Sequence, residues 1–183
     1  MRNQLFRLAI TCGLAGWILA CGCAPLPQPD DPESVELAGL IRDRGKSAVA
    51  AGESGSFELG TFVTRGGQRM KSIVLVAPVA VRADLSGLSG RFALRLSVAP
   101  VFNLGDGMQM EILLRTNGEG RPLYSRYFDA GRRAGDRKWT TLEIPLDLDR
   151  KSDLEIRVSG GPQGDLITDW LALAEARLVP IDK

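Results

Sequence analysis

Few side chains of this sequence could carry catalysis, and their types decide which reactions are open to it. Histidine is absent from the 183 residues, which excludes Ser-His-Asp and Cys-His nucleophilic systems, histidine-ligated zinc and imidazole acid–base catalysis. Hydrolysis by two carboxylates needs no histidine, and Asp106 and Asp165 are the pair that could be considered for it. No second polar constellation accompanies this pair, so we expect that the protein is not an enzyme.

Trp139 and Trp170 are the side chains best suited to ligand binding. An aromatic face packs against the C–H groups of a sugar, while nearby polar groups fix its hydroxyls. Asp165 and Asp169 are close to Trp170 in the chain, and with Arg126 and Trp170 they form the set of candidate ligand-binding residues. The alternative for both tryptophans is packing in the core, since tryptophan is commonly buried between two sheets.

A structural calcium ion is the candidate cofactor, with Glu175 and Asp106 as its candidate ligands. Calcium requires ~6–8 oxygen ligands, several of them usually backbone carbonyls, and Asp165 and Asp169 could add further oxygens. Glu175 is the best single candidate because it is expected beside the final strand. The sequence has no Asp-x-Asp-x-Asp pattern, so the alternative is that the aspartates form turns.

Five cations gather around one segment of the chain: Arg126, Arg132, Arg133, Arg137 and Lys138. A carboxylate-bearing glycan or a phosphate would suit them, and a solvated loop would suit them equally. The formal net charge of the whole chain is +1. Such a balance gives no field that would attract nucleic acid, so we expect no nucleic-acid partner.

The N-terminal segment has the features of an export signal. A short basic start is followed by an uncharged run from Leu8 to Ala20, which is shorter than the ~20 residues needed to span a bilayer and is typical of a signal peptide. The run ends in Ile18-Leu19-Ala20-Cys21, which resembles a bacterial lipobox. The resemblance implies that residues 1–20 are removed and that Cys21 is lipidated. Cys23 is the alternative site, and an ordinary cleaved signal peptide is the other alternative.

Residues 21–33 follow as a tether that begins with Cys21 and is rich in proline, and a segment of this composition is extended. Acyl chains at Cys21 would anchor the protein stably to a membrane. We therefore expect an exported, membrane-anchored lipoprotein of the bacterial cell envelope. The last cysteine is Cys23, so the domain that follows must fold without disulfides.

Residues 34–183 are expected to form a single domain of about eight strands. Alternating apolar and polar residues with turn signals between them predict strands at 57–63, 73–76, 91–98, 108–114, 124–128, 139–146, 154–158 and 177–181. One short N-terminal helix is expected to begin near Asp31-Pro32-Glu33, which has an acidic N-cap and a proline at the first position. Residues 170–178 could form a helix, but we favour a loop that runs into the last strand. This pattern predicts an all-β sandwich or barrel.

Several motifs occur in a fixed order in the second half of the chain. They are Gly105-Asp106-Gly107 before a strand, Leu123–Arg126 in the return strand, Arg137–Trp139 before the next, Ile144–Leu148, and Gly164-Asp165 to Asp169-Trp170. In this order they resemble bacterial galactose-binding-like jelly-roll domains, the superfamily that contains many carbohydrate-binding modules. The resemblance implies an antiparallel jelly-roll β-sandwich whose loops at one end bind a ligand.

We therefore expect a lipid-anchored, exported and non-catalytic binding module for carbohydrate or another extracytoplasmic polymer. The alternative is a structural or accessory envelope lipoprotein that docks onto another protein. An exposed aromatic residue beside Arg126 or Asp165 would favour the first function, and a broad flat apolar face would favour the second.

Overall fold

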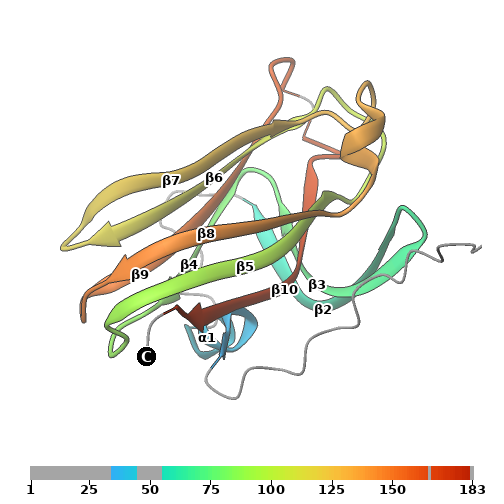
Figure 1. Ribbon diagram of the computed structural model, residues 1–183. Coiled ribbons are helices and arrows are strands. Elements are labelled where there is room, and N and C mark those ends of the chain that lie inside the picture. The colour runs from blue at the N-terminus through green and yellow to red at the C-terminus, as the bar shows by residue number, and fades with distance from the viewer. Residues whose placement is uncertain (1–33, 45–54, 165, 182–183) are drawn as a thin grey trace, which may run out of the picture.

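The computed structural model of the chain consists of two antiparallel β-sheets packed face to face (Figure 1). It describes residues 34–44, 55–164 and 166–181. The six-stranded sheet has the order β2 (Ser56–Arg65), β3 (Gln68–Val76), β10 (Trp170–Pro180), β5 (Gly90–Pro100) and β8 (Thr140–Leu148), and the short β1 (Val35–Glu36) also pairs with β10. The four-stranded sheet has the order β4 (Val79–Asp84), β9 (Ser152–Gly160), β6 (Met108–Thr116) and β7 (Glu119–Phe128). The helix α1 (Leu37–Arg44) and the 3-10 turn η2 (Ala134–Arg137) are the other elements of the described chain.

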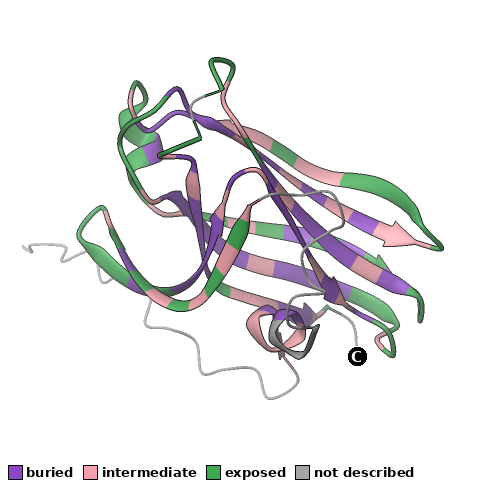
Figure 2. Cartoon of the chain, turned by 180° about the vertical axis from the view of Figure 1, so that it is seen from behind, coloured by how far each residue is buried: buried purple, intermediate pink, exposed green. Residues whose placement is uncertain are grey.

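The alternation of apolar residues along the strands explains the packing, and Figure 2 shows buried and exposed positions following one another along them. Leu94 of β5 and Ile112 of β6 belong to one core that draws residues from both sheets, and both side chains are fully buried. Arg95, the neighbour of Leu94, faces outward and pairs with Glu143 of β8. The side-chain period of two is therefore the reason that these strands close over a shared core.

The all-β, antiparallel, jelly-roll-like sandwich expected from the sequence is confirmed, and each of the eight predicted strands overlaps an observed one. The short helix is also present, although it begins at Leu37 rather than near Asp31. Two strands are missing from the prediction, β1 and β4. For residues 170–176 both the favoured loop and the alternative helix are wrong, because β10 already begins at Trp170 and pairs with both β3 and β5. The predicted leader, Cys21 and the tether lie outside the described residues.

Several connections between strands meet at one end of the sandwich. The strand registers bring residues 101–107, 129–139 and 161–169 together there, because Met108 lies opposite both Phe128 and Gly160. The hairpin of β2 and β3 bends away from its sheet (Figure 1), and its Gly66–Gly67 turn reaches the same region, where a Cβ on Gly66 would lie 3.1 Å from Cγ of Lys138. Among the described residues, no helix is long and apolar enough to cross a bilayer.

Candidate functional site

Two buried aspartates hold the loops at this end of the sandwich. Asp106 is 6% exposed and Asp169 is 0% exposed. Oδ2 of Asp106 accepts a hydrogen bond from the backbone N–H of Gln163, and Oδ2 of Asp169 accepts one from Gly161 at 3.3 Å. The carboxylate of Asp169, which the sequence suggested as a ligand-binding group, therefore lies inside the protein and shapes the 161–169 loop.

The Gly105-Asp106-Gly107 motif allows the 101–107 and 161–169 loops to touch. Gly105 has a φ of +89°, which favours glycine. A Cβ at Gly105 would lie 2.3 Å from Oγ1 of Thr168, so no other residue fits without displacing that side chain. The hydroxyl of Tyr127 donates to the backbone carbonyl of Asp106 and ties the motif to β7. The motif is thus required for packing between the loops.

The two candidate calcium ligands are separated in the structure. Oδ1 of Asp106 and Oγ1 of Thr168 are buried without a hydrogen-bond partner, and both oxygens could coordinate a cation. Glu175 is exposed at a bulge of β10, with a φ of +52°, and it is five residues along the strand from Trp170, a span of roughly 15 Å. The described residues contain no group of three acidic or cysteine side chains that could hold a metal. The side chains present therefore supply only part of a calcium shell.

Arg126, another candidate ligand-binding residue, is engaged within the protein. Its Nη2 lies 2.5 Å from Oδ1 of Asp136, and its guanidinium lies over the ring of Phe128 at 4.5 Å. Oδ2 of Asp136 accepts a hydrogen bond from the backbone N–H of Asp129 at 2.8 Å. Arg126 therefore positions the 129–139 loop. Asp165 lies outside the described residues.

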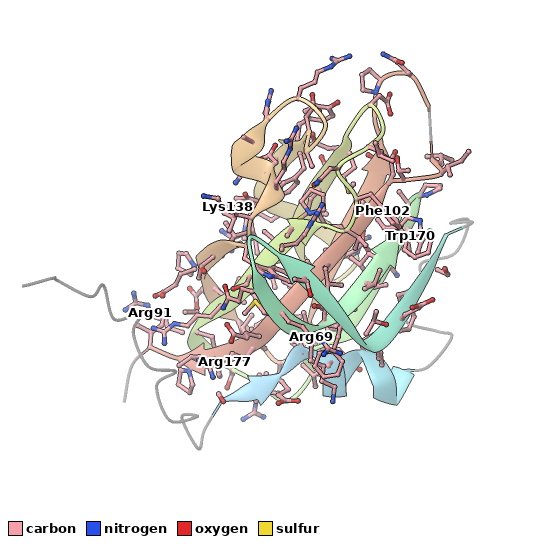
Figure 3. All side chains as sticks on the ribbon, turned by 90° about the vertical axis from the view of Figure 1, so that its right-hand side faces the viewer. Arg69, Arg91, Phe102, Lys138, Trp170 and Arg177 are labelled. Atoms are coloured by element: carbon pink, nitrogen blue, oxygen red, sulfur yellow. The ribbon has the colours of Figure 1, made fainter. Side chains whose placement is uncertain are left out.

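Trp170 does lie at the surface of this end, and it has an aromatic neighbour. It is half-buried, and its ring meets that of Phe102 edge to face, with centroids 5.4 Å apart and an interplanar angle of 69°. Figure 3 shows the two side chains next to each other. Phe102 is 37% exposed. The sequence analysis does not identify Phe102, although a phenylalanine just before Gly105 is a signal that could have found it.

Trp139 has a structural role on the outer face of the six-stranded sheet. With Trp170 and Val101 it packs against a small buried cluster of Val63, Val74 and Ala172. Its indole Nε1–H donates a 3.1 Å hydrogen bond to the carbonyl of Gln68, next to the hairpin turn. Trp139 therefore packs within the protein, which was the alternative to ligand binding. Trp170 both packs against the cluster and reaches the surface.

The loops that carry the aromatic pair also carry exposed aliphatic side chains, which the sequence analysis does not identify. Leu104 is 70% exposed and Ile167 is 84% exposed, and Leu166 is also exposed. They lie on the same two loops as Phe102 and the residues before Trp170. Exposed apolar side chains that gather at one end of a soluble domain can mark a binding site. We call Phe102, Leu104, Leu166, Ile167 and Trp170 the apolar end.

Known proteins resemble the chain in structure only. No family model matches it, and no curated protein matches it. Among solved structures, it is similar to the CBM51 of a Clostridium perfringens GH95 protein, in complex with methyl-galactose, with 18% identity and a TM-score of 0.58. That alignment covers 80% of this chain and 99% of the module.

Two further similar structures contain the same type of module. One is the tandem CBM51 modules of Sp3GH98, a family 98 glycoside hydrolase from Streptococcus pneumoniae SP3-BS71, with 14% identity and a TM-score of 0.54. The other is CBM51-2 with the INT domains of Clostridium perfringens ZmpB, with 13% identity and a TM-score of 0.55. Each alignment covers 80% of this chain, but only 47% of the Sp3GH98 chain and 31% of the ZmpB chain. The chain therefore shares its β-sandwich fold with carbohydrate-binding modules.

Proposed function

We propose that the protein is a non-catalytic carbohydrate-binding module that binds a glycan at the apolar end. The observation that carries this proposal is the Phe102–Trp170 pair, because it places two aromatic rings in contact at the surface of the loops. Sugar rings offer C–H groups to such surfaces, and aromatic side chains lose little conformational entropy on binding because they have two rotatable bonds. The fold shared with modules crystallised with sugars supports the proposal as an analogy.

The loops beneath the pair favour binding without large rearrangement. The hydrogen bonds that Asp106 and Asp169 accept from the backbone, together with the close packing at Gly105, fix both loops before a ligand arrives. A preformed site reduces the entropic cost of binding. Asp106, one of the two acids considered for hydrolysis, is buried and accepts a hydrogen bond from Gln163, which supports a non-catalytic role for it.

Phe102→Ala is the variant that tests the proposal. We expect it to weaken glycan binding about fivefold, because one aromatic contact contributes about 1 kcal/mol. Phe62→Ala is the matched control, since Phe62 is 57% exposed on the β2–β3 hairpin but is outside the apolar end. Affinity electrophoresis against a set of neutral and acidic polysaccharides would measure both. Equal affinities of the two variants for every polymer bound would contradict the proposed site.

A second function is favoured by the aliphatic part of the same end. Leu104 and Ile167 are more exposed than Phe102, and aliphatic side chains are better suited to a protein surface than to a sugar. The alternative is therefore docking onto an envelope protein. Absence of glycan binding, together with a stoichiometric partner that is lost from the Ile167→Ser variant, would favour docking.

We also propose that the module is exported and held at a membrane through Cys21. The lipobox-like Ile18–Cys21 motif supports this, as does the proline-rich segment after it, which would lift the domain from the membrane surface. Such an anchor would hold the binding end at the cell envelope.

A further inference from the structure

In the 129–139 loop beside the apolar end, the acidic side chains are buried and the basic side chains are exposed. Its two carboxylates are inside, since Asp129 is 5% exposed and Asp136 is 2% exposed. Its cations are outside: Arg132, Arg133, Arg137 and Lys138 are all exposed. Because Arg126 already neutralises Asp136, the surface that this loop presents to solvent is cationic.

The β2–β3 hairpin adds a fifth cation to this surface. Its turn packs on Lys138, and the carbonyl of Gln68 accepts the indole hydrogen bond of Trp139. Arg65, the last residue of β2, donates from Nε to the carbonyl of Pro100. Figure 3 shows Lys138 on the side of the molecule that also carries Phe102 and Trp170. We call Arg65, Arg132, Arg133, Arg137 and Lys138 the basic patch.

Three cations of the basic patch, Arg65, Arg133 and Arg137, are held in place by contacts within the protein, but none of the five is neutralised. Arg137 donates from Nε to the carbonyl of Ala130 at 2.7 Å and from Nη2 to that of Gly131 at 2.8 Å, and Arg133 lies over the ring of Tyr127. Within the described parts of the chain, none of the five has a carboxylate within ion-pair distance. By contrast, Arg82, Arg115 and Arg157 of the four-stranded sheet share Glu155.

Arg65 lies close enough to Arg137 for the two positive charges to repel each other. Its Nη2 is buried without a hydrogen-bond partner. Burial, followed by repulsion from Arg137, lowers the pKa of the Arg65 guanidinium. A negatively charged group bound near Arg137 would offset this repulsion.

We infer that the ligand of the module is an acidic polysaccharide, whose sugar rings contact the apolar end and whose carboxylate or sulfate groups bind the basic patch. This inference rests on the proposed glycan-binding function. The two surfaces adjoin, because Arg65 is bonded to Pro100, only two residues before Phe102. Guanidinium groups match the planar oxygens of a carboxylate and also bind sulfate-like tetrahedral groups. A repeating acidic polymer would engage several cations at once.

The test measures binding of the full chain to immobilised polygalacturonate and to its fully methyl-esterified form, which has the same rings without the charges. Dextran sulfate and dextran form the second pair, so that the carboxylate and sulfate sources are distinguished. The charge variant is Arg132→Gln with Lys138→Gln, because neither side chain makes a hydrogen bond or ion pair in the described structure. The control is Arg121→Gln with Arg150→Gln, two exposed cations at the opposite end of the sandwich that change the net charge equally.

We expect at least one acidic polymer to bind about tenfold or more tightly than its uncharged partner, since two charge-assisted contacts are gained. The patch variant should lose most of that preference while the control keeps it, and salt should weaken the charged interaction. Equal binding of charged and uncharged polymers, with no effect of the patch variant, would overturn this inference and leave the proposed glycan function intact. Failure of every polymer to bind would overturn both. Loss of binding to phosphatidylglycerol vesicles in the patch variant, without polymer binding, would assign the patch to a membrane instead.

Discussion

Replacement of Leu94 by alanine should destabilise the sandwich strongly. Leu94 lies in β5, between β10 and β8, where it is opposite Leu178 and Ile144, and its side chain is fully buried. The shorter side chain loses its burial and leaves a cavity that the strands on either side cannot fill. The free energy of unfolding should fall by ~2–5 kcal/mol.

Arg95→Ala provides the control within the same strand. Arg95 occupies the outer face, and its Nε lies 3.0 Å from Oε2 of Glu143. Both partners are well exposed, at 39% and 61% of their side chains, so solvent screens the pair and its loss should cost less than about 1 kcal/mol. The register in which Leu94 faces the core therefore predicts a clear difference between two adjacent positions.

Equilibrium unfolding in urea measures both variants, with the midpoint and slope determined separately. A similar slope for the two proteins would show that the unfolded states are comparable. If Arg95→Ala were as damaging as Leu94→Ala, the assignment of inward and outward faces in β5 would be refuted. A shift of one residue in register exchanges every side chain between the faces.

Three further predictions concern the acid stability, the hairpin and the N-terminus. Burial would raise the pKa of Glu155, but hydrogen bonds, beginning with that of Arg82, hold this pKa below its ordinary value of 4.5. The contribution of Glu155 to stability should therefore be complete above pH 4.5 and be lost as the pH falls through the lowered pKa. Between about pH 5 and pH 3, the urea midpoint should fall less in Glu155→Gln than in the unmodified protein, and parallel curves would contradict this. Trp139→Phe removes the indole hydrogen bond to Gln68 and should lower the free energy of unfolding by about 1 kcal/mol. This substitution should accelerate amide exchange more in the β2–β3 hairpin than in β6. Unchanged exchange in the hairpin would argue that Trp139 does not hold it in place. Cys21→Ser should abolish incorporation of labelled palmitate and retention in the membrane fraction, whereas normal labelling would move the site to Cys23 or discard it.

Much of the fold is predictable from the sequence because its strands are half-buried. In β6 and β8 apolar residues alternate with more exposed ones, and this local pattern determines which face each side chain occupies. Strand β4 is harder to predict, since Val79–Asp84 follows β3 after only two residues and has no polar turn before it. Which sheet such a segment joins depends on pairing with the distant β9, and no local pattern records that choice.

The site is less predictable, because its contacts are made between residues far apart in the chain. The sequence identifies Trp170 and the acidic turn residues but does not distinguish an aspartate that binds a ligand from one that accepts backbone hydrogen bonds. Asp169 and Asp106 belong to the second kind, as their burial shows. Likewise, Arg65 joins the basic patch only because the hairpin folds across the sheet to Pro100, which is 35 residues away.

The most direct test of the glycan-binding proposal is a titration monitored through the indole N–H resonances of the tryptophans in the ¹⁵N-labelled protein. Trp170 and Trp139 share the cluster on the outer face of the six-stranded sheet, but the indole of Trp139 is bonded to Gln68 within the protein. Because Trp139 follows Lys138 of the basic patch, its resonance reports contact with the patch, whereas that of Trp170 reports contact with the apolar end. The account predicts that a bound oligosaccharide shifts the Trp170 resonance strongly. Saturable binding that leaves the Trp170 resonance unmoved would contradict the placement of the site at the apolar end.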